Sequence, residues 1–213
     1  MSKTARRCIT GFAVGLLALL AACYLPNHFR SEIRLGPTGD YALSFYGELI
    51  WAPLYRDIRQ GHLSKSEIAV KTEEIRRDLA RDSNFKKIEP MGDGSFKVSY
   101  EREGRLLASD MVTFVRRNAI ILAIRATPDG LLTVNGNTLK PSDAQTATTM
   151  GLDVRGEFRV TTDGLVKEHN ATMVKPFGRA FVYIWTIENA FSPAPHLVMQ
   201  RAGAWPTKAE QHK

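Results

Sequence analysis

Alternating apolar and polar residues predict β-strands along most of the chain. The first clear case is Tyr41, Leu43 and Phe45, which follow the turn-forming segment 36–40 and would complete a hairpin begun at residues 31–35. Turn pairs such as Asp-Gly separate the later strands. In total the pattern predicts about eight strands, at 31–35, 41–45, 96–100, 119–124, 131–134, 154–160, 166 onward and 181–187.

Helical spacing of apolar residues predicts an early pair of helices. The first lies between residues 50 and 61, and Pro53 suits its first turn. The second starts at Ser64, with Glu67 as the partner in a capping box, and runs to about residue 82. The polar segment 141–149 has room for one further short helix.

Strands without regular βα alternation, together with an early helical pair, predict an α+β fold. We expect a mainly antiparallel sheet of about eight strands with the helical pair packed on one face. No linker or repeat interrupts the middle of the chain, so residues 35–201 are predicted to form a single domain, with a split near 141–151 as the alternative. The polar tail 202–213 is predicted to be disordered.

The N-terminus has the pattern of a secretory signal peptide. Lys3, Arg6 and Arg7 form a basic region without acidic residues, and the apolar run 8–22 follows them. Residues 1–22 are therefore predicted to be removed after export. An uncleaved signal anchor is the main alternative, because the apolar stretch 8–25 is at the lower limit for a membrane-spanning helix. A twin-arginine signal and an amphipathic helix fit the pattern less well.

The end of the apolar run, Leu20-Ala21-Ala22-Cys23, resembles the lipobox of bacterial lipoproteins. The resemblance implies cleavage between Ala22 and Cys23 and acyl chains, such as palmitate, on the Cys23 thiol. Two or three acyl chains anchor a protein durably, whereas one chain binds membranes only marginally. Residues 23–34 would then be a short lipidated tether. Tyr24 stands where an Asp would favour the inner membrane, so the resemblance favours the outer membrane, with the domain facing the periplasm.

The net charge of the chain depends on whether the predicted signal peptide is counted. The 213-residue chain is 44% hydrophobic and 24% charged, with two cysteines and a net charge of +7. Two cysteines argue against a disulfide scaffold. Losing residues 1–22 removes three of the 29 basic residues and none of the 22 acidic residues, so the net charge falls to +4. With no clustered basic helix, nucleic-acid binding is not predicted.

A search for catalytic and cofactor motifs finds no phosphate loop, nucleophile elbow, His-Glu-x-x-His or Cys-x-x-Cys pattern. The five histidines are scattered and lack metal-ligand spacing. We therefore predict no catalytic residue, metal or cofactor, and the chain is not expected to be an enzyme. An unrecognised hydrolase using His169 as a general base, oriented by Asn170, is the least favoured alternative.

Large aromatic side chains are usually core, but some could line a cleft between the helix 64–82 and the sheet. Near a strand end, Asn170 could instead be a turn residue in the left-handed conformation, and His169 could be an exposed strand residue. The candidate ligand-binding residues are Trp51, Tyr55, His169, Asn170 and Trp185.

The order of these elements, with Asn170, Trp185 and Pro193, resembles the LppM-like lipoproteins of actinobacteria. That resemblance implies a lipid-binding helix-grip domain and assigns no other site residue. The sequence thus predicts a membrane-anchored lipoprotein with a non-catalytic binding domain. Its partner would be a lipid or other apolar ligand, which it carries or senses. Alternatively, it would be a structural or assembly partner of an envelope complex, using a sheet edge or the charged helix face.

Overall fold

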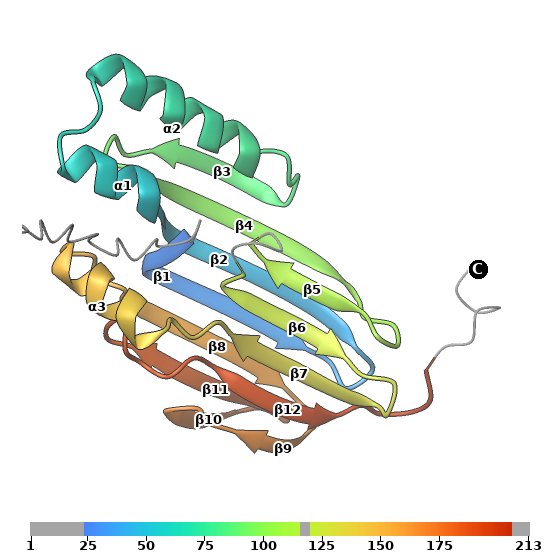
Figure 1. The fold of residues 1–213 in the computed structure, drawn as a ribbon. Coiled ribbons are helices and arrows are strands. Elements are labelled where there is room, and N and C mark those ends of the chain that lie inside the picture. Colours follow the sequence, from blue (N-terminus) through green and yellow to red (C-terminus); the bar gives the residue numbers. More distant parts are fainter. Residues whose placement is uncertain (1–23, 116–119, 206–213) are drawn as a thin grey trace, which may run out of the picture.

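Two β-sheets and three helices form the fold in a computed structural model that describes residues 24–115 and 120–205 (Figure 1). The seven-stranded sheet has the order β10-β11-β8-β1-β2-β4-β3, and the five-stranded sheet has the order β5-β6-β7-β12-β9. The strands are β1 (Tyr24–Leu35), β2 (Asp40–Trp51), β3 (Phe85–Pro90), β4 (Ser95–Arg105), β5 (Met111–Phe114), β6 (Leu122–Ala126), β7 (Leu131–Gly136), β8 (Gly156–Thr162), β9 (Leu165–His169), β10 (Met173–Phe177), β11 (Ala180–Ile187) and β12 (His196–Gln200). The helices are α1 (Ala52–Arg59), α2 (Lys65–Leu79) and α3 (Pro141–Thr149).

This architecture confirms the predicted α+β class, but the described residues form twelve strands in two sheets rather than about eight in one. The short edge strands account for part of the difference. All five residues of β10 are exposed, and β9 and β3 contain no buried residue. Such strands lack the alternation that predicts a strand from sequence. All pairs are antiparallel except β1 with β8.

β1 corrects the prediction of a tether over residues 23–34. It pairs with β2 on one side and with β8 on the other, in the middle of the seven-stranded sheet. Phe29, Ser31 and Ile33 point into the core, while Arg30 and Arg34, at alternate positions, are exposed. The outward charges give this segment its linker-like composition. Cys23 and the signal segment lie outside the described residues.

The core lies between the two sheets, where aromatic rings make direct contacts. The ring centroid of Phe45 in β2 is 4.5 Å from that of Phe114 in β5, and Phe114 also lies 4.8 Å from Tyr100 in β4. Residues before and after α3 contribute to both sheets and to one continuous cluster of buried side chains. All of these buried side chains lie between residues 24 and 199.

The helices begin and end largely as predicted. Pro53 lies in the first turn of α1, Gly61 follows the C-terminal cap with a φ of 69°, and Ser64 and Glu67 form the capping box of α2. Residues 50 and 51 belong to β2 rather than to a helix. α2 lies along β3 at one flank of the molecule, and Leu79 is its only buried residue (Figure 1). No helix in the described ranges is long and apolar enough to span a membrane.

The C-terminal end of the described chain is ordered by specific contacts up to Trp205. The Ala202 amide donates to the Pro37 carbonyl, and the buried Arg201 guanidinium stacks on the Trp205 ring at 4.2 Å. These contacts correct the prediction of a disordered tail for residues 202–205. The remainder of that tail, 206–213, lies outside the described residues.

Candidate apolar ligand site

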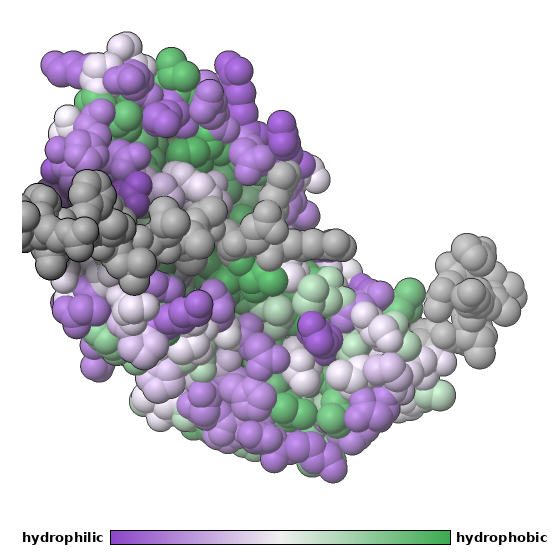
Figure 2. All heavy atoms as spheres, viewed as in Figure 1, coloured by the Kyte–Doolittle hydropathy of each residue, from purple (hydrophilic) through white to green (hydrophobic). Residues whose placement is uncertain are grey.

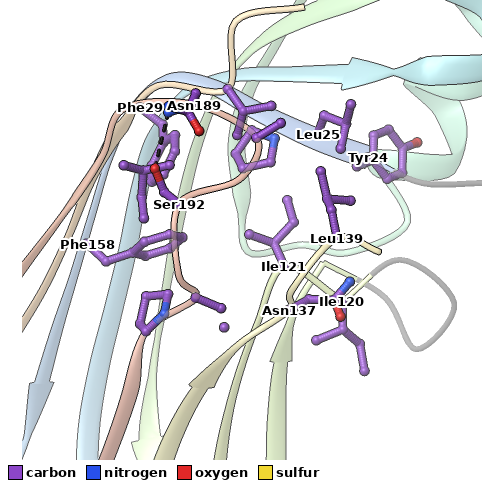
Figure 3. A pocket seen from close by; sticks show the side chains of 17 residues that line it. Tyr24, Leu25, Phe29, Ile120, Ile121, Asn137, Leu139, Phe158, Asn189 and Ser192 are labelled. Carbon is purple, nitrogen blue, oxygen red and sulfur yellow. Dashed lines mark hydrogen bonds between the residues drawn. The ribbon is translucent and has the colours of Figure 1, made fainter. Parts of the chain in front are cut away.

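An apolar cleft opens at the end of the molecule where β1 begins (Figure 3). One wall comes from the start of β1, and the others come from the ends of β6 and β7, the segment after β11, and residues flanking α3. The lining residues are Tyr24, Leu25, Pro26, Phe29, Ile120, Ile121, Gly136, Asn137, Leu139, Val154, Phe158, Ile187, Asn189, Ala190, Ser192, Ala194 and Pro195.

None of these lining residues is charged. The polar groups are limited to the Tyr24 hydroxyl, two asparagine amides and the Ser192 hydroxyl. The cleft therefore has the chemistry to hold an apolar group with a few orienting hydrogen bonds. No group of three or more His, Cys, Asp or Glu side chains that could hold a metal ion occurs in the part of the chain that the structure describes.

The size of the cleft limits what it holds without rearrangement. Its volume is about 60 Å³. This exceeds the roughly 10–15 Å³ that one water molecule requires, but pockets for drug-sized ligands measure roughly 300–1,000 Å³. In this conformation the cleft can accept a small apolar group or the end of a longer chain. A larger ligand requires the walls to separate.

Phe29 forms part of the cleft wall because two glycines let its backbone and ring approach neighbouring strands. A Cβ added at Gly156 would lie 2.3 Å from Phe29 Cδ1, and one at Gly47 would lie 2.6 Å from Phe29 Cα. His28, immediately before Phe29, has a φ of 43°, where the pairing of β1 with β2 shifts register. The ring then packs on Phe158 at 4.7 Å between centroids. The register shift at residues 27–30 thus determines how the Phe29 ring is oriented in the cleft wall.

The Pro-rich segment between β11 and β12 forms another part of the cleft wall. The amides of Glu188 and Asn189 donate to the Ser192 hydroxyl at 3.0 and 3.2 Å, which closes a tight turn (Figure 3). The Gly136 amide donates to the Pro195 carbonyl at 2.7 Å. These bonds attach the segment to the end of β7 and hold Ala190 at the cleft surface.

The side-chain amide of Asn170 links this segment to the core. Its oxygen accepts from the Trp185 indole N–H at 2.7 Å and from the His196 amide at 2.8 Å, and its nitrogen donates to the Ala194 carbonyl at 2.9 Å. Trp185 is only 1% exposed, so its indole N–H requires a partner inside the protein. Asn170 is therefore a positioning residue for the cleft wall. It does not have the positive φ expected of a left-handed turn residue.

The structure brings together only some of the residues predicted from sequence. Asn170 and Trp185 are hydrogen-bonded to each other, and neither lines the cleft. Trp51 lies behind Tyr24, with 4.6 Å between ring centroids, and Tyr55 lies beneath the Arg59 guanidinium. The pair Asn170 and Trp185 and the pair Trp51 and Tyr55 therefore do not form one site. The cleft also lies elsewhere than between α2 and the sheet, where the sequence placed it.

His169 is an exposed residue of β9, in agreement with the plainer prediction for it. Its ring lies edge-on to Tyr183 at 4.9 Å, and its Nδ1 accepts from the Ala171 amide. Burial raises the pKa of the Tyr183 hydroxyl above its ordinary value of 10.

None of the cleft residues was predicted as a ligand-binding residue. Ile121, Leu139 and Val154 are far apart in the sequence and lie outside any motif. The one available signal was the pairing of small residues and prolines at 190–195, which favours an ordered bend. Pro193 was noted, but only as part of a family resemblance.

Comparison with known proteins gives little further information. No protein-family model and no curated protein matches the chain. Among solved structures, the NMR structure of the folded domain of LppM from Mycobacterium tuberculosis matches weakly, with a TM-score of 0.37 and 11% identity. The alignment covers 88% of this chain and 96% of that chain. At this TM-score the similarity carries no argument about the site.

Proposed function

We propose that the chain is a bacterial lipoprotein, cleaved before Cys23 and acylated there, whose domain faces the periplasm and binds an apolar ligand without catalysing a reaction. The outer membrane is the favoured location. The ligand site is the apolar cleft. The proposal combines the lipobox pattern at residues 20–23 with the chemistry of a cleft that has no charged lining residue.

The observation that carries the proposal is the position of Tyr24 and Leu25 in the cleft wall. An acylated Cys23 would lie at the bilayer surface, and Tyr24 follows it directly in the chain. The cleft would then be close to the membrane, which is the source of apolar molecules in the envelope. The acyl end of a lipid fits the chemistry of the cleft, and the limited volume favours a chain end over a whole lipid.

The ligand site can be tested with the chain 24–213, which retains every buried core residue of the described structure. Ala190→Leu fills the cleft with three additional carbons. We expect binding of a dansyl-labelled fatty acid to weaken by about tenfold or more, because the ligand and the new side chain would occupy the same space. Ala69→Leu, on the exposed side of α2, is the matched control and should bind as the original chain does.

Equal binding by the Ala190→Leu and Ala69→Leu variants would exclude the cleft as the ligand site. If the purified chain neither binds the fatty acid nor releases an apolar molecule on extraction, the assembly role becomes the better explanation.

The anchor is tested separately in the full chain. Cys23→Ser removes the thiol that would carry the lipid, so metabolic labelling with a tagged fatty acid should be lost. Cys8→Ser, in the segment predicted to be removed, is the control and should keep the label. Label that persists on the Cys23→Ser variant would show that the lipobox interpretation is wrong.

A further inference from the structure

Exposed apolar side chains gather on one part of the molecule. Ten large hydrophobic side chains are exposed in the described residues, and five of them lie between residues 165 and 181. Phe177 is 68% exposed and Phe181 is 49% exposed. The five residues are Leu165, Met173, Val174, Phe177 and Phe181. Four of them belong to β10, the turn after it and the first residues of β11. We call residues 173–181 the β10–β11 hairpin.

This region is an uncovered flank of both sheets. β10 is the edge strand of the seven-stranded sheet, and β9 is the edge strand of the five-stranded sheet. Figure 1 places β9 and β10 together at the lower side, opposite α2, which lies along edge strand β3. Figure 2 shows hydrophobic atoms among hydrophilic ones both on the α2 side and at the lower end. Among the described residues, one flank therefore has a covering helix and the other has none.

The hairpin also carries basic side chains without acidic partners. Lys175 and Arg179 are exposed and form no ion pair within the part of the chain that the structure describes. A groove of about 720 Å³ runs beside the hairpin, and Phe177, Arg179 and Arg34 contribute to its walls. Arg34 is likewise exposed and forms no ion pair among the described residues. Arg159 and the acidic residues Glu32 and Asp163 also line the groove, so its charge is mixed, with three arginines and two carboxylates.

The edge of β10 itself is poorly suited to a partner strand. Lys175 and Pro176 occupy the middle of the strand, and proline lacks the N–H needed to pair. Charged residues and prolines are common protections of edge strands against pairing. Phe181 is in register with Pro176 and Phe177 with Ala180, so the two phenylalanines flank the turn on opposite faces of the hairpin. A turn with an exposed ring on each face and an arginine at its tip is better suited to a fluid apolar surface with anionic groups.

We propose that the β10–β11 hairpin binds the surface of a bilayer that contains anionic lipids. Phe177 and Phe181 enter the boundary between headgroups and acyl chains, and lipid phosphates accept hydrogen bonds from Arg179 and Arg34. Side chains with an apolar face and a cationic neighbour are stable at this depth. Lys175 adds a further attraction to the negative surface.

The position of the hairpin separates this contact from the cleft. Phe181 is in register with Thr162, and the neighbouring Thr161 is in register with Arg34, near the end of β1. Tyr24 begins the same strand, ten residues and thus roughly 33 Å before Arg34 at about 3.3 Å per residue. The membrane contact does not depend on acylation of Cys23 and uses no residue of the cleft.

The test measures co-sedimentation of the chain 24–213 with vesicles made of equal parts phosphatidylglycerol and phosphatidylcholine. We expect binding to these vesicles and little to vesicles of phosphatidylcholine alone. The double variant F177S/F181S should bind these vesicles at least about tenfold more weakly than the original chain. K175Q/R179Q should lose about fivefold for each basic residue removed, and added salt should weaken binding of the original chain.

Two matched controls distinguish the hairpin from general stickiness. V70S/M91S removes two exposed apolar side chains elsewhere, and K65Q/K140Q removes two exposed basic residues elsewhere. Both should bind as the original chain does. The proposal is overturned if the original chain does not bind the vesicles, or if the controls lose as much vesicle binding as the hairpin variants. A protein partner would then be the better explanation for this exposed flank. If soluble glycerol phosphate competes as strongly as vesicles, the groove binds free phosphate esters rather than a bilayer. Because the cleft is not altered, the fatty-acid assay reports on the proposed function independently.

Discussion

Asn170 and His169 are neighbours in the sequence, but their side chains have different surroundings. The Asn170 amide makes three hydrogen bonds, one of them to the buried Trp185 indole. His169 is exposed and contacts the ring of Tyr183. Sequence reasoning treated the two as a possible polar pair for a ligand. The structure gives Asn170 an architectural task, since removing its amide would leave a buried donor unpaired.

Replacing Asn170 with Ala should therefore destabilise the fold. An unsatisfied buried donor costs about 1–3 kcal/mol, and here the Trp185 indole N–H loses its acceptor. The measurement is urea unfolding of the chain 24–213 monitored by tryptophan fluorescence. His169→Ala is the matched control and should change the free energy of unfolding by about 0.5 kcal/mol or less. Equal effects of the two substitutions would show that Asn170 is not a structural link.

At the scale of elements, α2 is stabilised more by interactions within the helix than by burial of its side chains. Ser64 and Glu67 cap its first turn, while the Glu73 carboxylate accepts hydrogen bonds from Arg76 and Arg77 at 2.7 to 2.8 Å. Those hydrogen bonds, mainly from Arg76 and then from Arg77, lower the pKa of Glu73 from its ordinary 4.5 to about 2. The helix is therefore expected to respond to acid.

The pH dependence has a definite sign. Because the pKa of Glu73 is lower in the folded state, its stabilisation is present above about pH 4.5 and is lost as pH falls towards 2. Glu73→Gln should remove a small part of the acid sensitivity of the thermal midpoint in this range. Glu74→Gln, on an exposed neighbour, should keep it. High salt should reduce the difference in acid sensitivity between the two variants, since the Glu73 carboxylate is at the surface and its interactions are screened. Identical acid profiles for both variants would refute this role of Glu73.

Several elements could be predicted from the sequence because their signals are local. The capping box located the start of α2, and alternation at Tyr41, Leu43 and Phe45 located β2. β10 escaped prediction because it is exposed along its whole length. The predicted hairpin of residues 31–35 with 41–45 is confirmed, but the earlier part of β1 was interpreted as a tether because its outward residues are polar or charged. The cleft could not be predicted at all. Its walls meet only after β1 pairs in parallel with β8, a contact between segments more than a hundred residues apart.

On the scale of the whole molecule, the two proposed contacts lie at opposite ends of β1. The cleft begins at Tyr24, and the hairpin lies beside the end of the strand at Leu35. Neither contact uses α2, whose flank is already covered. A rigid pair of sheets would therefore hold an apolar ligand at one end while the other end is free to bind a membrane surface.

The central place of β1 leads to a prediction about the whole fold. A chain that begins at Leu35 lacks the strand that joins β2 to β8, so it leaves two new edges inside the seven-stranded sheet. It also loses the core side chains Leu25, Phe29 and Ile33. We expect this shorter chain to unfold without cooperativity in urea and to expose its tryptophans to solvent. The chain 24–213 is the control and should unfold in a single transition. A folded, cooperative chain starting at Leu35 would restore the tether interpretation, because only a segment outside the core can be removed at so little cost.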